Sequence, residues 1–361
     1  MKFNPRMPLM VFFLFVIFQG HAQVAAVQLH GRAERIENET VLIGSASSVS
    51  FAFTGDSLSI ELESRDSQPH HNYVSLELDG VYLKRLKIEK GAKRWYTIPV
   101  TGKSNHRLVI YKATEAANGT VVFTGADTKI LGLPSTQSRK KIEFIGNSIT
   151  CGMGNDTAEI PCGTGEWYDQ HNAYWAYGPI LSRKLDADFL LSSVSGIGMY
   201  RNWNDEHEKE AIMPEVYEKL YLSKDSEKKY DFNFKPDLIS ICLGTNDLSD
   251  GDGKKPRLPF NEEKYVANYI AFVKMIYTHN PQARLVLLTS PMISGEKNAT
   301  FVKCLERVIA AFAGDKTHKP IALFEFQPMK PNGCGYHPDR EDHKVMAAQL
   351  ESLFKKLLDE K

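Results

Sequence analysis

Apolar and polar residues alternate with a period of two through the first third of the chain. The runs are about five to eight residues long and are separated by Gly and Asp, as in antiparallel β-structure. They read SVSFAF, SLSIELE, NYVSLEL, VYLKRLKI, RWYTIPV, HRLVIYKA and VVFTG. The pair Asp79-Gly80 between two runs is a strong hairpin signal, because both turn positions require positive φ. We predict an antiparallel β-sandwich of jelly-roll type over residues 24–131.

The rhythm changes after a Pro- and Gly-containing linker at residues 132–139. Near-continuous apolar runs now recur at residues 141–146, 189–194, 237–244, 284–290 and 321–326. Runs of this kind are typical of parallel strands covered by helices on both faces. Apolar stripes at helical spacing lie at 262–280, 301–312 and 346–357, and we assign them to the core. The sequence predicts a doubly wound α/β domain with a five-stranded parallel sheet over residues 140–361.

The first 22 residues have the organisation of a secretory leader. Lys2 and Arg6 precede an apolar run from Met7 to Phe18, and small residues around Ala22 form a cleavage pattern. We predict a signal peptide at residues 1–22 and a secreted or periplasmic protein that has no membrane contact after cleavage. A membrane anchor is the alternative, but the run is shorter than the roughly 20 residues that a spanning helix needs.

The charge balance and the cysteine count limit the kinds of partner and the kinds of covalent bond that we expect. The 44 basic residues are matched by 44 acidic ones, so nothing favours binding to nucleic acid or to an anionic membrane. Export permits disulfides, and the odd count of five cysteines leaves at least one unpaired if bridges are intramolecular. Cys242, inside an apolar run, is the expected free thiol. The disulfide pairing among the four other cysteines stays open, and a Cys151–Cys162 bridge is one possibility. The four are Cys151, Cys162, Cys304 and Cys334.

Small and polar residues follow the predicted parallel strands. Ser148 comes just after the first strand, Gly196 after the second and Asn246 after the third, and His337 lies near the C-terminus. The carboxyl ends of parallel strands share one edge of a sheet, which is where ligands bind in such folds. A serine near a histidine is suited to nucleophilic acyl transfer. We therefore expect Ser148 at the edge of the sheet where a ligand would bind.

The motifs around these residues resemble those of the SGNH, or GDSL, hydrolase superfamily, and within it carbohydrate esterase family 2. The matching segments are GNSITCG at the nucleophile, GIGMYRN at block two, GTND at block three and GCGYHP around the histidine. The resemblance implies that Ser148 is the nucleophile and His337 its base. It implies an oxyanion hole of the Ser148 and Gly196 N–H groups and the Asn246 amide.

The same resemblance implies a substrate class. Family members deacetylate plant polysaccharides such as xylan and glucomannan, so the expected partner is an acetylated oligo- or polysaccharide. No cofactor and no metal are needed for this chemistry. The segment DLSDGDG, with Asp247, Asp250 and Asp252, is similar to a calcium loop but lacks the remaining ligand spacing and the terminal Glu.

The chain departs from the superfamily beside His337. The usual acid three residues before the histidine is replaced by Cys334, and residue 335 is Gly. We predict a Ser-His dyad in which a main-chain carbonyl holds the imidazole Nδ1–H. Three carboxylates are alternative orienting groups: Glu325, Asp339 and Asp342. The last two are expected instead at the start of the final helix, where acids favour the helix N-terminus.

Aromatic residues near the motifs suit a sugar site, because an aromatic face packs against the C–H face of a pyranose. The candidate substrate contacts are Trp167, Tyr168, Tyr200, Trp203 and Tyr336. Two other functions stay as alternatives. One is a non-catalytic carbohydrate-binding protein with a vestigial esterase site, which the missing acid favours. The other is a lipid or thioester hydrolase of the GDSL type.

Overall fold

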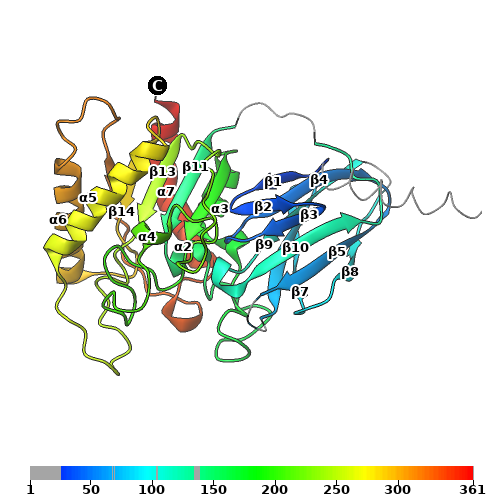
Figure 1. The fold of residues 1–361 in the computed structure, drawn as a ribbon, viewed down its shortest axis with the longest axis horizontal. Coiled ribbons are helices and arrows are strands. Elements are labelled where there is room, and N and C mark those ends of the chain that lie inside the picture. The colour runs from blue at the N-terminus through cyan, green and yellow to red at the C-terminus, as the bar shows by residue number, and fades with distance from the viewer. Residues whose placement is uncertain (1–25, 67, 69, 103–104, 134–138, 361) are drawn as a thin grey trace, which may run out of the picture.

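The computed structural model describes residues 26–66, 68, 70–102, 105–133 and 139–360. A β-sandwich and an α/β unit lie side by side along the long axis of the molecule (Figure 1). The predicted signal peptide lies outside the described residues. Within these residues, no helix has the length and apolar character needed to cross a membrane.

The N-terminal unit is a sandwich of two five-stranded antiparallel sheets, as predicted. The first sheet has the order β1 (Gln28–His30), β4 (Ser48–Thr54), β9 (Asn105–Lys112), β6 (Asn72–Leu78) and β7 (Val81–Ile88). The second has the order β2 (Ala33–Ile36), β3 (Glu39–Leu42), β10 (Thr120–Ala126), β5 (Ser57–Arg65) and β8 (Arg94–Pro99). The inner faces bury Phe51, Phe53 and Phe123 completely. The predicted hairpin turn is confirmed, with positive φ at both Asp79 and Gly80.

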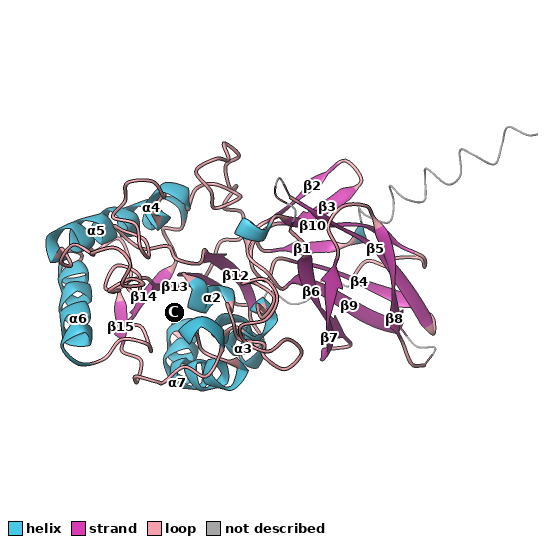
Figure 2. Cartoon of the chain, turned by 90° about the horizontal axis from the view of Figure 1, so that it is seen from below, coloured by secondary structure: helices cyan, strands magenta, loops and turns pink. Residues whose placement is uncertain are grey.

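The second unit contains the predicted five-stranded parallel sheet. Its order is β12 (Asp188–Ser193), β11 (Lys141–Gly146), β13 (Leu238–Cys242), β14 (Arg284–Leu288) and β15 (Ala322–Phe324). Helices α3 (Tyr177–Lys184) and α7 (Arg340–Asp359) cover one face, and α5 (Glu262–His279) and α6 (Gly295–Ala310) cover the other (Figure 2). The first strand, β11, lies between β12 and β13. The strand order therefore reverses at β11, and ligand crevices form at such a switch point.

The connections contain short helical segments. They are η1 (Ala116–Asn118), α2 (Ser148–Cys151), η2 (Ala173–Trp175), α4 (Met213–Val216) and η3 (Cys334–Tyr336). Helix α7 begins at an Asp339 N-cap that forms a capping box with Asp342. The expected start of the last helix is therefore confirmed.

A buried arginine joins the two units. Arg32, in the sandwich, is fully buried, and its guanidinium donates to Ser192 Oγ on β12 at 3.0 and 3.1 Å. It also donates to the main-chain carbonyls of Tyr217 and Lys219 at 2.9 and 2.8 Å. The buried Glu143 on β11 accepts from Ser192 Oγ at 2.7 Å and from the Tyr217 hydroxyl at 3.0 Å. The interface is thus a hydrogen-bonded network of the kind found inside a single core.

Candidate active site

Ser148 lies where an interior strand of the parallel sheet turns into a helix. Strand β11 ends at Gly146, and the Asn147 side chain caps α2 by accepting from the Ile149 N–H at 3.1 Å. A Cβ added at Gly146 would lie 2.0 Å from Thr150 Oγ1, so only glycine permits this tight turn. Ser148 becomes the first residue of α2, at the carboxyl edge of the sheet.

His337 reaches the same edge from the segment between β15 and α7. Its Nε2 lies 2.7 Å from Ser148 Oγ, and its Nδ1 lies 2.8 Å from the main-chain oxygen of Gly335. A carbonyl oxygen only accepts hydrogen bonds, so the neutral ring carries its proton on Nδ1 and presents a bare Nε2 to the serine hydroxyl. Burial lowers the pKa of His337 below its ordinary value of 6.5. The neutral imidazole, able to accept a proton, is therefore the dominant form near pH 7.

The three alternative orienting carboxylates hydrogen-bond elsewhere. Asp339 Oδ1 accepts from the Asp342 N–H at 2.9 Å, and Asp342 Oδ1 accepts from the Asn332 side chain at 2.9 Å. Glu325 Oε1 accepts from the Asn298 amide at 2.6 Å. The Gly335 carbonyl thus holds the position at Nδ1 that these acids would need.

The two predicted donor residues Gly196 and Asn246 follow β12 and β13, the strands on either side of β11. Gly196 has φ of +78°, and a Cβ built there would meet nothing within 4 Å. The glycine is therefore required by its left-handed backbone, and its open surroundings leave room for a substrate. The Asn246 amide donates one hydrogen to the Ile197 carbonyl at 2.7 Å. An amide nitrogen carries two hydrogens, so a second donor remains.

Asp247 has a structural role that the sequence did not reveal. Its fully buried carboxylate accepts main-chain N–H groups of Met199 and Tyr200, at 3.0 and 2.8 Å from Oδ1, and of Arg201 at 3.3 Å. Burial raises the pKa of this carboxyl despite these donors. In the sequence, Asn246-Asp247 reads as an ordinary turn after a strand. The structure instead makes Asp247 the anchor of the loop that follows Gly196.

The structure divides the predicted aromatic contacts into two groups. Trp203 and Trp167 are about half exposed, and Tyr336 is 85% exposed. The main-chain N–H of Trp203 donates to the Gly196 carbonyl at 2.8 Å, and Tyr336 directly precedes His337. Tyr168 and Tyr200 do not fit a substrate contact, because both are buried. Tyr200 packs in the core beneath α5 and accepts from the Asn261 N–H at 3.0 Å, which corrects its assignment.

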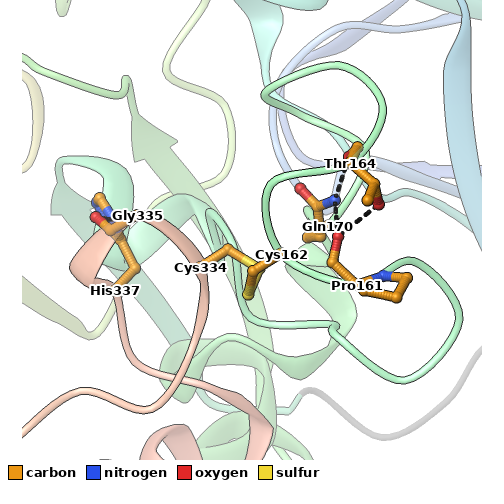
Figure 3. The surroundings of a disulfide bond; sticks show 7 residues. All are labelled: Pro161, Cys162, Thr164, Gln170, Cys334, Gly335 and His337. Carbon is orange, nitrogen blue, oxygen red and sulfur yellow. Dashed lines mark hydrogen bonds between the residues drawn. A yellow bond between two sulfur atoms is a disulfide. The ribbon is translucent and has the colours of Figure 1, made fainter.

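A disulfide supports the histidine segment. Cys162 pairs with Cys334, three residues before His337, while Cys151, Cys242 and Cys304 are free and buried. Figure 3 shows the bridge joining the histidine segment to the loop of Pro161, Thr164 and Gln170, where the Gln170 amide donates to the Thr164 carbonyl at 2.9 Å. The expected free thiol at Cys242 is confirmed. Cys162 pairs with a distant residue instead of with Cys151, a contact that the fold creates.

The acidic loop after β13 contains Asp247, Asp250 and Asp252. Among the residues that the structure describes, no group of three or more His, Cys, Asp or Glu side chains is arranged to hold a metal ion. Asp250 pairs with Lys297 at 2.6 Å.

The chain matches two known families in succession. Residues 29–134 match the N-terminal domain of carbohydrate esterase family 2, and residues 144–343 match the GDSL-like lipase/acylhydrolase family. An acetylxylan esterase / glucomannan deacetylase of Cellvibrio japonicus is 30% identical over 310 residues, which covers 83% of this chain and 81% of that protein.

Solved structures agree with these matches. A family two carbohydrate esterase from Clostridium thermocellum, in complex with cellohexaose, superposes with a TM-score of 0.80 and 26% identity, covering 92% of this chain and 99% of the other. The acetyl xylan esterase Est2A from the rumen bacterium Butyrivibrio proteoclasticus has a TM-score of 0.78 and 25% identity, covering 93% and 98%. The chain therefore belongs to carbohydrate esterase family 2, with a GDSL-type hydrolase domain, and is a carboxylic ester hydrolase.

Proposed function

We propose that this protein is a secreted esterase that removes O-acetyl groups from plant polysaccharide of the xylan or glucomannan type, with Ser148 as nucleophile and His337 as base. The observation that carries the proposal is the 2.7 Å contact between Ser148 Oγ and His337 Nε2, with Nδ1 bound to the Gly335 carbonyl. The named activities of the relatives support the substrate class. The predicted leader at residues 1–22 supports export.

The geometry suits a two-step acyl transfer. Ser148 Oγ attacks the acetyl carbonyl while its proton passes to His337 Nε2. The tetrahedral intermediate collapses, the bond to the sugar oxygen breaks, and the imidazolium returns the proton to that leaving oxygen. Water then attacks the acetyl-serine with the same base, releasing acetate and restoring the serine hydroxyl.

Negative charge develops on the former carbonyl oxygen in both steps, and it needs donors already in place. The Ser148 and Gly196 N–H groups and the Asn246 amide are the proposed donors. Asn246 is held by its bond to the Ile197 carbonyl, so its amide plane is fixed before substrate arrives. The exposed rings of Trp167, Trp203 and Tyr336 are the proposed surfaces for the sugar.

Replacing Asn246 with alanine should lower kcat about 100- to 1000-fold, the usual cost of removing one oxyanion donor. The donor matters most once charge has formed, so KM should change little. Steady-state kinetics on an aryl acetate would measure both constants. A change confined to KM would make Asn246 a residue that binds the ground state and not the oxyanion.

Acetyl esters should be cleaved much faster than butyryl or longer esters. Each methylene without space in a shallow site would have to displace packed side chains, which costs free energy. Initial rates on an aryl ester series, together with acetate release from acetylated xylan and glucomannan, test the proposal directly. Comparable rates on octanoyl esters would favour the lipid hydrolase. Glycan binding without acetate release would favour a carbohydrate-binding protein.

A further inference from the structure

A carboxylate from the β-sandwich reaches the loops of the hydrolase unit. Glu115 follows β9, and its side chain is completely buried. Its Oε2 accepts the Ser195 N–H at 2.7 Å and lies 3.7 Å from Cys151 Sγ. Ser195 directly precedes Gly196, and Cys151 ends the helix that Ser148 begins. One oxygen atom therefore contacts both segments that carry the proposed main-chain oxyanion donors.

The groups around Glu115 keep it anionic. Burial alone would raise the pKa of its carboxyl, but His171 and the Ser195 N–H hold that pKa below its usual value. His171 Nε2 lies 3.6 Å from Glu115 Oε1. The buried Lys112 ammonium donates to the Glu115 main-chain carbonyl at 2.6 Å, and burial lowers the pKa of this lysine to about 7.

The same carboxylate acts on the histidine through space. Burial has the largest effect on the pKa of His337 and lowers it; the nearby His171 lowers that pKa further, whereas the charge of Glu115 raises it. A negative charge near the imidazole favours the imidazolium that forms when Ser148 gives up its proton. In a triad the acid beside the histidine supplies that charge. Here the neutral Gly335 carbonyl occupies the position at Nδ1.

We propose that Glu115 is a positioning residue for ester hydrolysis: its carboxylate holds the Ser195–Gly196 turn against α2, so that the proposed main-chain oxyanion donors stay aligned. The inference rests on the proposed roles of Ser148 and His337. Burying a carboxylate carries a desolvation penalty that an apolar side chain would avoid. Because Glu115 lies between the two segments that carry the proposed oxyanion donors, this penalty can be offset by catalysis. Oxyanion donors stabilise the transition state only when they are oriented before the reaction.

Two substitutions separate the charge from the hydrogen bond. Glu115→Gln keeps the size and one oxygen acceptor but removes the charge. Glu115→Asp keeps the charge but withdraws the oxygens from the Ser195 N–H. The matched control is Glu77→Gln, because Glu77 is another buried sandwich carboxylate that contacts the hydrolase unit, accepting from the Tyr174 hydroxyl at 3.1 Å.

Glu115→Gln should lower kcat on an aryl acetate by about 10- to 100-fold, less than the loss of a direct donor. KM should stay unchanged. Removing the negative charge lowers the pKa of His337, so the acid limb of the kcat/KM profile should move to lower pH. Glu115→Asp should lower kcat without moving that limb, and Glu77→Gln should leave both at the wild-type values.

Each variant is first checked by thermal unfolding, and Ser148 is then labelled with a fluorophosphonate. The labelling rate depends on the nucleophile and the oxyanion donors and requires no acetylated glycan. A slower rate in the Glu115 variants therefore supports the inference even if wild type released no acetate from polysaccharide. A folded Glu115→Gln protein with wild-type kcat, labelling rate and acid limb would overturn it. So would loss of folding in both Glu115 variants, which would make the residue structural.

Discussion

Replacing Ser148 with alanine should abolish acetyl ester hydrolysis, lowering kcat by roughly a million-fold, as removal of the nucleophile does in comparable hydrolases. The variant lacks the hydroxyl that lies 2.7 Å from His337 Nε2, so the acetyl-enzyme on Ser148 cannot form. The fold should persist because one oxygen is lost at the end of a strand. Turnover of an aryl acetate and the midpoint of thermal unfolding measure the two effects.

Ser182→Ala is the matched control, since it makes the same change at a buried serine on α3. It should keep wild-type kcat. Activity near the wild-type level in the Ser148 variant would refute the nucleophile assignment and direct attention to another residue.

Replacing His337 with alanine should leave the enzyme nearly inert, because the serine hydroxyl then has no base. The wild-type protein should show the pH dependence of this base. Only the neutral imidazole accepts a proton, so activity should fall as pH drops through the pKa of His337. Burial holds that pKa below 6.5, so the acid limb should lie below pH 6.5. A pH series of kcat/KM with wild-type protein measures it.

The prediction that His337 works without a side-chain carboxylate is tested by substituting three acidic residues. Asp339→Asn, Asp342→Asn and Glu325→Gln should each keep most of the wild-type kcat, because their oxygens hydrogen-bond to groups other than His337. The two aspartates cap α7, so their variants need a check of folding. A loss of about 10,000-fold in one folded variant, as removal of a true triad acid costs, would identify that residue as the third member.

Local patterns were sufficient to predict much of the fold. Period-two runs marked seven of the sandwich strands, and near-continuous apolar runs marked all five parallel strands. Strands β1, β2 and β3 were not predicted, because three or four residues are too few to show a period. The convergence of Ser148 and His337 was predicted because the order of the motifs resembles that of the SGNH hydrolases, and the end of its strand placed Ser148 at the edge of the sheet.

The remaining site features depend on long-range contacts. Cys162 and Cys334 are 172 residues apart, and no local pattern distinguishes this pair from the others. Glu115 looks like any polar residue in a loop, and only the packing of the two units places it against Ser195. Tyr200 lies within a motif that suggested sugar binding, but the turn held by Asp247 directs its ring into the core.

The contacts of Arg32 between the two units limit how this protein can lose or exchange a domain during evolution. A domain that is joined to its neighbour only by a flexible linker shares few contacts with it, so it can be lost or exchanged without disturbing that neighbour. Here a chain without the sandwich would leave Ser192 Oγ and the carbonyls of Tyr217 and Lys219 without the donors that Arg32 supplies, and polar groups that lose a buried partner destabilise the fold. The sandwich is therefore a structural part of the hydrolase, and the sequences of the two units must evolve together at their interface. Either unit, if transferred to another protein, would need a partner with a matching interface.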